Sequence, residues 1–168
     1  MRMKKTLLLM ALICCMSAGL RAESGTCGAN LNWSFEGITL TITGSGAMTN
    51  YESYDSAPWY SIRESIMQVS LPEELTTIGK NAFNSCTKLR LVTIPAKVTT
   101  IANNAFDNCQ AMRGVTFAQG STLQTIGEYA FAKCYALTSI SLPSSLKTIK
   151  KEAFYNCKKL TSITIPAS

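Results

Sequence analysis

The sequence predicts an α/β solenoid, with a parallel sheet on one face of a stack of coils and short helical turns on the other. Two observations carry this prediction. The motif Ile-x-x-x-Ala-Phe-x-x-Cys occurs four times, at residues 78–86, 101–109, 126–134 and 149–157. Its phenylalanines are 23, 25 and 23 residues apart. A fixed period in the twenties is typical of a leucine-rich-repeat solenoid, whose coils bury a continuous core only when they stack.

One half of each repeat has the pattern of a strand. Residues 137–142 alternate apolar and hydroxyl side chains, which indicates a half-buried strand. Pro143 follows, and proline ends a strand because it has no N–H to donate. Pro72, Pro95 and Pro166 hold the same place in their repeats. The remaining repeat carries residues 118–122 there and is two residues longer, which predicts a loop that bulges from the solenoid.

The other half of each repeat places Ile78, Ala82 and Phe83 at helical spacing, which predicts one short turn of helix per coil. The cysteine column Cys86, Cys109, Cys134 and Cys157 is expected to pack as small apolar side chains. A ladder of disulfides or metal sites is the alternative. Stacked cysteines point their Cβ atoms the same way, which suits neither a disulfide nor the convergent ligands of zinc.

Three segments are predicted along the chain. Residues 63–168 form the solenoid, with one partial and four recognisable repeats. Residues 23–62 form an N-terminal cap. Two alternating runs at 31–35 and 38–42, joined by Glu36 and Gly37, predict a β-hairpin within it. Trp59 and Tyr60 stand where later coils have Ala and Phe, so they are expected in a modified first coil.

Residues 1–22 read as a secretory signal peptide, with cleavage expected after Ala22. Basic residues precede a ten-residue apolar run at 7–16 that is too short to span a bilayer. No later stretch is apolar enough to cross a membrane, so no transmembrane segment is expected. The mature protein is therefore predicted to be secreted or held at the cell surface.

Charge is divided unevenly along the chain. Removal of the four basic residues in 1–22 leaves twelve basic and ten acidic residues, a net charge of +2. Residues 23–75 hold seven acids and one base, whereas residues 76–168 hold eleven bases and three acids. This asymmetry suggests two interpretations, a polyanion-binding surface or lysines that simply solvate the outer turns.

The composition argues against an enzyme. The chain has no histidine, which removes Ser-His and Cys-His pairs, histidine metal sites and the usual general base near neutral pH. The few acidic residues of the repeats occupy variable positions, and no glycine-rich phosphate-binding loop is present. No catalytic residue, metal or cofactor is predicted.

The repeat Ile-x-x-x-Ala-Phe-x-x-Cys-x-x-Leu-x-x-Ile-x-Ile-Pro resembles the BspA-like class of leucine-rich repeats found in bacterial surface proteins. Residues 25–28, 44–48 and 57–60 resemble the region that often precedes such repeats. The resemblance implies a secreted or surface-attached protein in adhesion or host-protein binding. No binding residues transfer by motif.

The outward face of the predicted sheet is the candidate binding surface. It presents small hydroxyl residues with almost no charge, flanked by two arginines, and such a face could hydrogen-bond an extracellular protein or a glycan; no nucleic-acid partner is predicted. Its residues are Gln68, Ser70, Arg90, Leu91, Thr93, Arg113, Thr116, Ser139, Ser141, Ser162 and Thr164. The alternative is a polyanion-binding or passive surface-coat scaffold that uses the lysine-rich convex side, with Lys147, Lys150, Lys151, Lys158 and Lys159.

The last strand of the sequence, at residues 160–165, is expected to pair on one side only. It would then leave one end of the core open, with Ile149, Phe154, Leu160, Ile163 and Ile165 exposed. Open strand edges template association, and solenoids need polar caps for solubility. We therefore expect either self-association through this coil or a longer natural array of which this sequence is a part.

Overall fold

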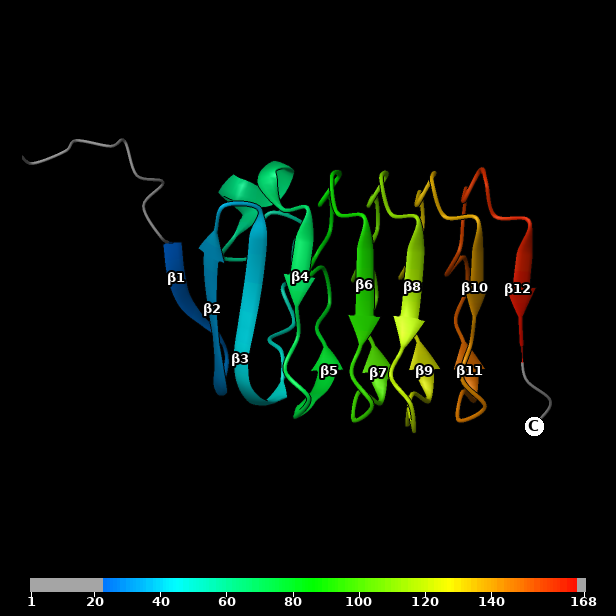
Figure 1. Ribbon diagram of the computed structural model, residues 1–168, viewed down its shortest axis with the longest axis horizontal. Helices are drawn as coiled ribbons and strands as arrows, with labels where there is room; N and C mark the ends of the chain where they lie inside the picture. Colours follow the sequence, from blue (N-terminus) through cyan, green and yellow to red (C-terminus); the bar gives the residue numbers. More distant parts are fainter. Residues whose placement is uncertain (1–22, 166–168) are drawn as a thin grey trace, which may run out of the picture.

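The computed structural model describes residues 23–165 and shows coils stacked along one axis (Figure 1). The signal-peptide prediction for residues 1–22 lies outside these residues. The elements are β1 (Glu23–Gly28), β2 (Asn30–Glu36), β3 (Thr39–Ala47), the 3₁₀ helix η1 (Tyr60–Ser65), β4 (Gln68–Ser70), β5 (Leu75–Ile78), β6 (Leu91–Ile94), β7 (Thr100–Ile101), β8 (Gly114–Phe117), β9 (Thr125–Ile126), β10 (Ser139–Ser141), β11 (Thr148–Ile149) and β12 (Ser162–Thr164).

Each coil contributes one strand to each of two parallel ladders. The front ladder contains β4, β6 and β8, with β10 and β12 continuing the row as a separate pair. The side ladder contains the shorter strands β5, β7, β9 and β11. The register advances by one repeat per coil, so Val92 lies beside Val115 and Ile101 beside Ile126. The parallel sheet predicted from the alternating runs is therefore present, and a second parallel ladder accompanies it.

The helical turns predicted for the Ala-Phe segments are not found, and the α/β description is wrong in this respect. These residues form turns that bond to the next coil. The N–H groups of Asn81, Phe83 and Ser85 donate to carbonyls of residues 103, 105 and 107 one coil further on. The intervening N–H groups of Ala82 and Asn84 donate three residues back, to Gly79 and Asn81. The molecule is therefore a β-solenoid of about four turns.

Left-handed backbone explains why no helix forms. Two residues per coil have positive φ, for example Asn81 at 57° and Ser85 at 60°. In each coil, one of these residues precedes the alanine and the other precedes the cysteine. Left-handed residues therefore stand four positions apart, which interrupts any helical turn in this segment. Asparagine accepts this conformation more readily than most residues, and it occupies four of the eight sites, which makes it the sequence signal for a turn here.

Stacked aromatic rings run through the core along the solenoid axis. Phe83, Phe106, Phe131 and Phe154 follow one another with ring centroids 5.1, 5.3 and 5.6 Å apart and interplanar angles of 13° or less. The first three rings are fully buried, as are the alanines that precede them. The phenylalanine column predicted from the repeat is thus a continuous stack.

The N-terminal cap closes one end of this core. β2 and β3 form the predicted hairpin, and β1 pairs with β2 on its far side. β3 is long enough to serve both ladders, because residues 39–41 pair with β4 and residues 46–47 pair with β5. The hairpin therefore supplies the first strand of each ladder (Figure 1).

The first coil differs in one detail from the sequence interpretation. Trp59, which was aligned with the alanine column, takes the place of the phenylalanine. Its ring stacks on Phe83 at 5.7 Å, and its Nε1–H donates to the carbonyl oxygen of Ala82 at 2.8 Å. Tyr60 starts η1 and is only half-buried. The larger indole fills the phenylalanine site and also covers the junction with the cap, where it meets Trp33 edge-on.

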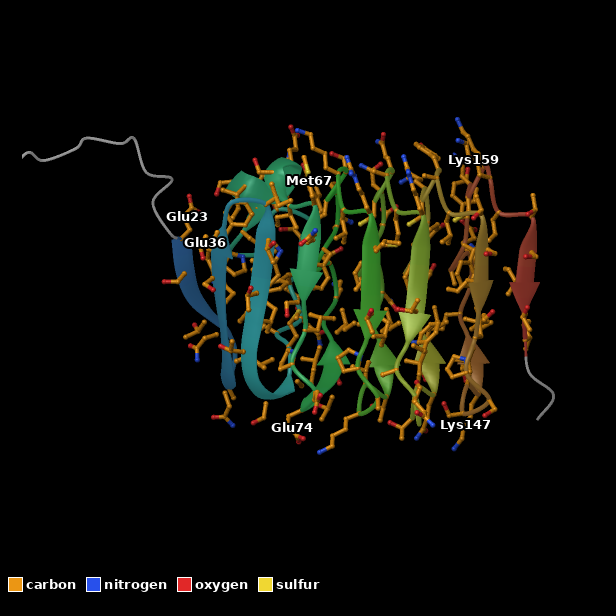
Figure 2. The ribbon with its side chains drawn as sticks, viewed as in Figure 1. Glu23, Glu36, Met67, Glu74, Lys147 and Lys159 are labelled. Atoms are coloured by element: carbon orange, nitrogen blue, oxygen red, sulfur yellow. The ribbon has the colours of Figure 1, made fainter. Side chains whose placement is uncertain are left out.

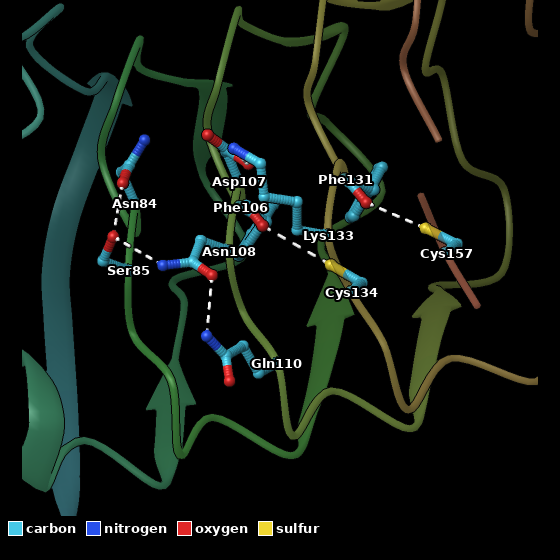
Figure 3. Close-up of polar contacts among 10 residues, drawn as sticks. All are labelled: Asn84, Ser85, Phe106, Asp107, Asn108, Gln110, Phe131, Lys133, Cys134 and Cys157. Carbon is cyan, nitrogen blue, oxygen red and sulfur yellow. Dashed lines mark hydrogen bonds and ion pairs between the residues drawn. The ribbon is translucent and has the colours of Figure 1, made fainter. Parts of the chain in front are cut away.

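The cysteine column is a ladder of hydrogen-bond donors. The thiols of Cys109, Cys134 and Cys157 each donate to the carbonyl oxygen of the phenylalanine in the preceding coil, at 3.2, 3.4 and 3.1 Å. Figure 3 shows the contacts of Cys134 and Cys157. Cys86, Cys109 and Cys134 are fully buried, whereas Cys157 is partly exposed. All five cysteines of residues 23–165 are free thiols. The cysteine thus packs as a small apolar group and adds a weak bond between coils.

Truncation of the central ring tests the aromatic stack. Phe106→Ala is expected to lower the free energy of unfolding by about 3–5 kcal/mol, because it leaves a cavity between two stacked rings. Phe154→Ala, whose ring is partly exposed, should cost clearly less. Urea denaturation of both variants checks this. Equal losses at the two positions would contradict a buried continuous stack.

The thiols predict a stability that declines at alkaline pH. Burial raises the pKa of Cys86 from 9.0 to about 12, and burial also raises the pKa of Cys109. The folded state holds these thiols in the protonated form. Their contribution to the free energy of unfolding is therefore complete below about pH 9 and is lost as the pH rises above it. Thermal unfolding across this range should show the decline, and Cys86→Ala should make it shallower. Stability that is flat between about pH 8 and 11 would contradict the prediction.

We expect the protein to associate with copies of itself through the coil that contains β12. Ile149, Ile163 and Ile165 are 38%, 40% and 64% exposed, and the outer edge of β12 has no neighbour within residues 23–165. Light scattering of the protein over a concentration series should therefore show a rising average mass. Ile163→Lys should suppress the rise, while Thr116→Lys on the front ladder should not. A constant monomer mass would contradict the prediction.

Candidate functional site

The front ladder exposes the row of residues singled out in the sequence. Gln68, Ser70, Leu91, Thr93 and the other outward positions of β4 to β12 are solvent-exposed, apart from Gly114, which is half-buried. Their inward neighbours Val92 and Ile94 are buried. The structure thus brings the predicted row together on one face, from Gln68 and Ser70 through Leu91, Thr93, Thr116, Ser139 and Ser141 to Ser162 and Thr164.

The exposed face has relief. Leu91 is 63% exposed, the largest apolar side chain on this row. Its register partner is Gly114, and a Cβ at that position would approach Leu91 Cδ2 to 3.2 Å. Below them, the hydroxyls of Thr93 and Thr116 bond to each other at 2.9 Å. The Leu91 side chain therefore lies over Gly114 and forms one apolar patch in an otherwise hydroxyl-rich surface.

The front ladder is interrupted at two positions. Between β4 and β6 only the pair Gln68 and Leu91 is in ladder register, whereas β6 and β8 share four pairs. Between β8 and β10 no ladder forms at all. The second interruption coincides with the two-residue insertion after β8, which follows the strand as the predicted loop with Gly120 at φ 73°. Because this connection is longer, β8 and β10 are not held in ladder register.

Each interruption lies beneath a groove. Groove A, of about 700 Å³, covers β4 and β6, and its residues are Gln68, Val69, Ser70, Leu71, Glu73, Glu74, Leu91, Val92, Thr93, Pro95, Ala96, Lys97, Ala118 and Gln119. Groove B, of about 610 Å³, covers β8 and β10, and its residues are Arg113, Gly114, Val115, Thr116, Phe117, Ala118, Gly120, Ser121, Ser139, Ile140, Ser141, Pro143 and Ser144. Both volumes fall in the usual range of small-ligand sites.

The two grooves differ in charge. Groove A contains Glu73 and Glu74, and Lys97 pairs with Glu74 at 2.6 Å. Groove B contains Arg113 and no acidic residue. The inserted loop forms the wall between them, because Ala118 belongs to both grooves while Gln119 faces one and Gly120 the other. A two-residue insertion therefore divides one sheet face into two sites of opposite character.

Arg90 and Arg113 occupy equivalent positions in adjacent coils, just before β6 and β8. The N–H of Arg113 donates to the carbonyl oxygen of Arg90 at 2.8 Å, so the two side chains start one coil apart. Both are exposed. Within residues 23–165 neither guanidinium has an ion pair or a hydrogen bond. The arginines predicted to flank the face therefore present two adjacent unpaired positive charges.

Charge is also divided between the ends of the molecule. Figure 2 shows Glu23 and Glu36 at the cap and Lys147 and Lys159 at the opposite end. Lys147, Lys150, Lys151, Lys158 and Lys159 are all exposed. Lys151 pairs with Glu152 at 3.4 Å, and the Nζ of Lys158 lies 4.7 Å from the ring centre of Tyr135. These lysines extend over two coils and several sides, so they do not converge on one site.

A polar network occupies the turn side of the coils. The Nδ2 of Asn108 donates to the hydroxyl of Ser85 at 3.2 Å, and Gln110 donates to Asn108 at 2.9 Å (Figure 3). Lys133 pairs with Asp107 at 3.4 Å across the next coil step. These groups satisfy one another, which marks this side as structural.

Residues 23–165 contain neither a metal-binding cluster nor a membrane-spanning helix. No cluster of three or more His, Cys, Asp or Glu side chains in this part of the chain is arranged to hold a metal ion. Among the same residues, no helix has the length and hydropathy needed to cross a bilayer.

Sequence reasoning missed the groove residues at and beyond the strand ends. Phe117, Ser121 and Ser144 line groove B, and Glu73 and Gln119 line groove A, although none belongs to the outward row. The insertion at residues 118–122 was the available signal, because a break in a strict repeat marks where neighbouring coils are spaced differently.

Comparison with known proteins agrees with this architecture. The family described as the BspA-type leucine-rich repeat region matches residues 58–168 in six copies. The structure is similar to a leucine-rich repeat protein from Eubacterium ventriosum (26% identity, TM-score 0.69, covering 84% of this chain and 43% of that chain). It is also similar to the leucine-rich repeat protein of T. pallidum (26% identity, TM-score 0.61, covering 84% of this chain and 72% of that chain).

A leucine-rich repeat protein from Bacteroides ovatus shares the fold (23% identity, TM-score 0.58, covering 82% of this chain and 40% of that chain). The chain thus spans less than half the length of the Eubacterium and Bacteroides proteins. No curated protein matches it. The family match covers well over half of the sequence and coincides with the observed coils. The chain therefore belongs to the BspA-type leucine-rich repeat family.

Proposed function

We propose that this protein is an extracellular binding module, not an enzyme, that attaches to a protein or glycan of a host or neighbouring cell through its front ladder. The observation that carries the proposal is the uncovered face of β4 to β12, with two grooves on a rigid stack of coils. Solenoids of this kind use extended faces to bind macromolecules.

The chemistry of the face supports binding. Its hydroxyl side chains donate and accept hydrogen bonds without the desolvation cost of burying a charge. Leu91 adds exposed apolar surface, and a partner that covers it gains free energy from the burial. The backbone beneath is fixed by stacked coils, so little conformational entropy is lost when a partner is bound.

We propose a secreted or cell-surface location for the mature protein. The support is the signal-peptide pattern of residues 1–22, together with membership of a repeat family that resembles bacterial surface proteins. The buried thiols are compatible with an oxidising environment, because burial raises the pKa of Cys27 to about 11 and keeps it from forming a reactive thiolate.

Substitutions on the face test the proposal. Leu91→Glu and Thr116→Lys should each reduce capture of extracellular-matrix proteins on the immobilised protein by about tenfold, because each places a charge in the centre of the contact. Glu128→Lys, on the turn side, is the matched control and should bind normally. Circular dichroism verifies that each variant folds. Equal capture by all variants would place binding elsewhere.

A second candidate function uses the lysines of the last coils. The five exposed lysines Lys147, Lys150, Lys151, Lys158 and Lys159 favour association with a polyanion or a passive role in a surface coat. They carry most of the positive charge of that end of the molecule, and few acidic groups lie among them.

Retention on heparin as a function of salt separates the two candidates. Exposed charges are screened over about 8 Å at physiological ionic strength, so weak retention that disappears near 0.15 M salt is expected. Lys158→Gln combined with Lys159→Gln should weaken the low-salt retention further. Tight retention well above that salt concentration that is lost in this double variant would favour the polyanion function over the front-ladder function.

A further inference from the structure

We propose that groove B binds an acidic saccharide, with Arg113 holding the carboxylate or sulfate group of the sugar. This inference rests on the function proposed above, since it names the ligand class for one part of the same face. The proposed ligand would bind in groove B and not in groove A or at the lysines of the last coils. Four properties of the groove lead to it: charge, hydroxyl lining, apolar surface and shape.

The charge of groove B favours an anion. Arg113 is its one charged residue, and within the described chain its guanidinium has no acidic partner. Arg90 starts one coil away and likewise has no ion pair within the described chain. Guanidinium groups bind carboxylates and sulfate-like oxyanions through two parallel hydrogen bonds.

The lining of groove B matches the hydroxyl groups of a sugar. Hydroxyl side chains from two strands and from the loops that follow them line the groove: Thr116, Ser121, Ser139, Ser141 and Ser144. Each can donate and accept a hydrogen bond. A saccharide ring carries hydroxyl groups of the same dual kind.

The groove also has an apolar part. Phe117 and Pro143 line it, and Phe117 is only half-buried. The C–H face of a sugar ring can pack against such surface while its hydroxyls bond to the serines. The volume of about 610 Å³ accommodates a short oligosaccharide. Charge, hydroxyls and apolar surface thus occur together in one concave site.

Groove A provides an internal comparison. It lies on the same face and has a similar volume, but Glu73 and Glu74 make it acidic and Lys97 is already paired. An acidic sugar would be repelled there. Binding of such a ligand should therefore depend on Arg113 and not on groove A.

Isothermal titration calorimetry of the protein at physiological salt tests the inference with three probes. These are a hyaluronan tetrasaccharide, which carries carboxylates, a heparin-derived tetrasaccharide, which also carries sulfates, and neutral maltotetraose. We expect one or both acidic probes to bind and maltotetraose not to bind. The two acidic probes identify which anionic group is preferred.

Variants assign the binding to groove B. Arg113→Gln should weaken binding by about tenfold or more, and Arg113→Lys should be intermediate because it keeps the charge but loses the two-pronged geometry. Ser139→Glu should also weaken binding by placing a carboxylate across the groove. The pair Lys158→Gln and Lys159→Gln changes charge elsewhere and should have no effect. Circular dichroism confirms that each variant is folded.

Three outcomes would overturn the inference: no binding of either acidic probe, equal binding of maltotetraose, or loss of binding in the lysine variant with none in Arg113→Gln. The proposed front-ladder function is tested separately, by the capture of matrix proteins. If capture still depends on Leu91 and Thr116 while no acidic probe binds, the saccharide inference fails and the front-ladder function stands. If neither is observed, both fail.

Discussion

The structure depends on main-chain hydrogen bonds between successive coils. On three sides of the solenoid, N–H groups of one coil donate to carbonyl oxygens of a neighbour, including the alternating donors of Asn81, Phe83 and Ser85 on the turn side. This bonding fixes the coil spacing, and the spacing brings identical side chains into contact. The phenylalanine rings stack at 5.1–5.6 Å as a direct result.

The same constraint explains the cysteine column. Because every phenylalanine carbonyl lies beside the next coil, a short side chain with a donor can reach it, and the thiols of Cys109 and Cys134 do so at 3.2 and 3.4 Å. The neighbouring thiol of Cys157 and burial raise the pKa of Cys134, whereas the thiol of Cys134 lowers the pKa of Cys157. The buried thiols of Cys109 and Cys134 therefore add bonds between successive coils.

The two candidate binding grooves lie where the regular bonding between strands is reduced or absent. The ladder is complete between β6 and β8 but reduced or absent on either side of them, and both grooves lie over those gaps. The insertion after β8 supplies the wall between the grooves, and unpaired Arg113 gives one of them its charge. A strictly periodic array would present a flat, uniform face. The irregularity of one repeat creates the shape and charge differences that a ligand can distinguish.

The sequence by itself determined the repeat, its register, the core columns, the outward row on the front ladder and the hairpin of the cap. These follow from local periodicity, because a strand that alternates apolar and hydroxyl residues can bury only one of its faces. The turns at residues 79–86 and the position of Trp59 were decided by tertiary structure. Spacing of Ile78, Ala82 and Phe83 fits a helix equally well, and only the neighbouring coil, which accepts the hydrogen bonds of alternate residues, excludes it. The grooves were also decided by tertiary structure. The missing ladder between β8 and β10 depends on how two coils meet around an insertion, and it leaves no pattern within either strand.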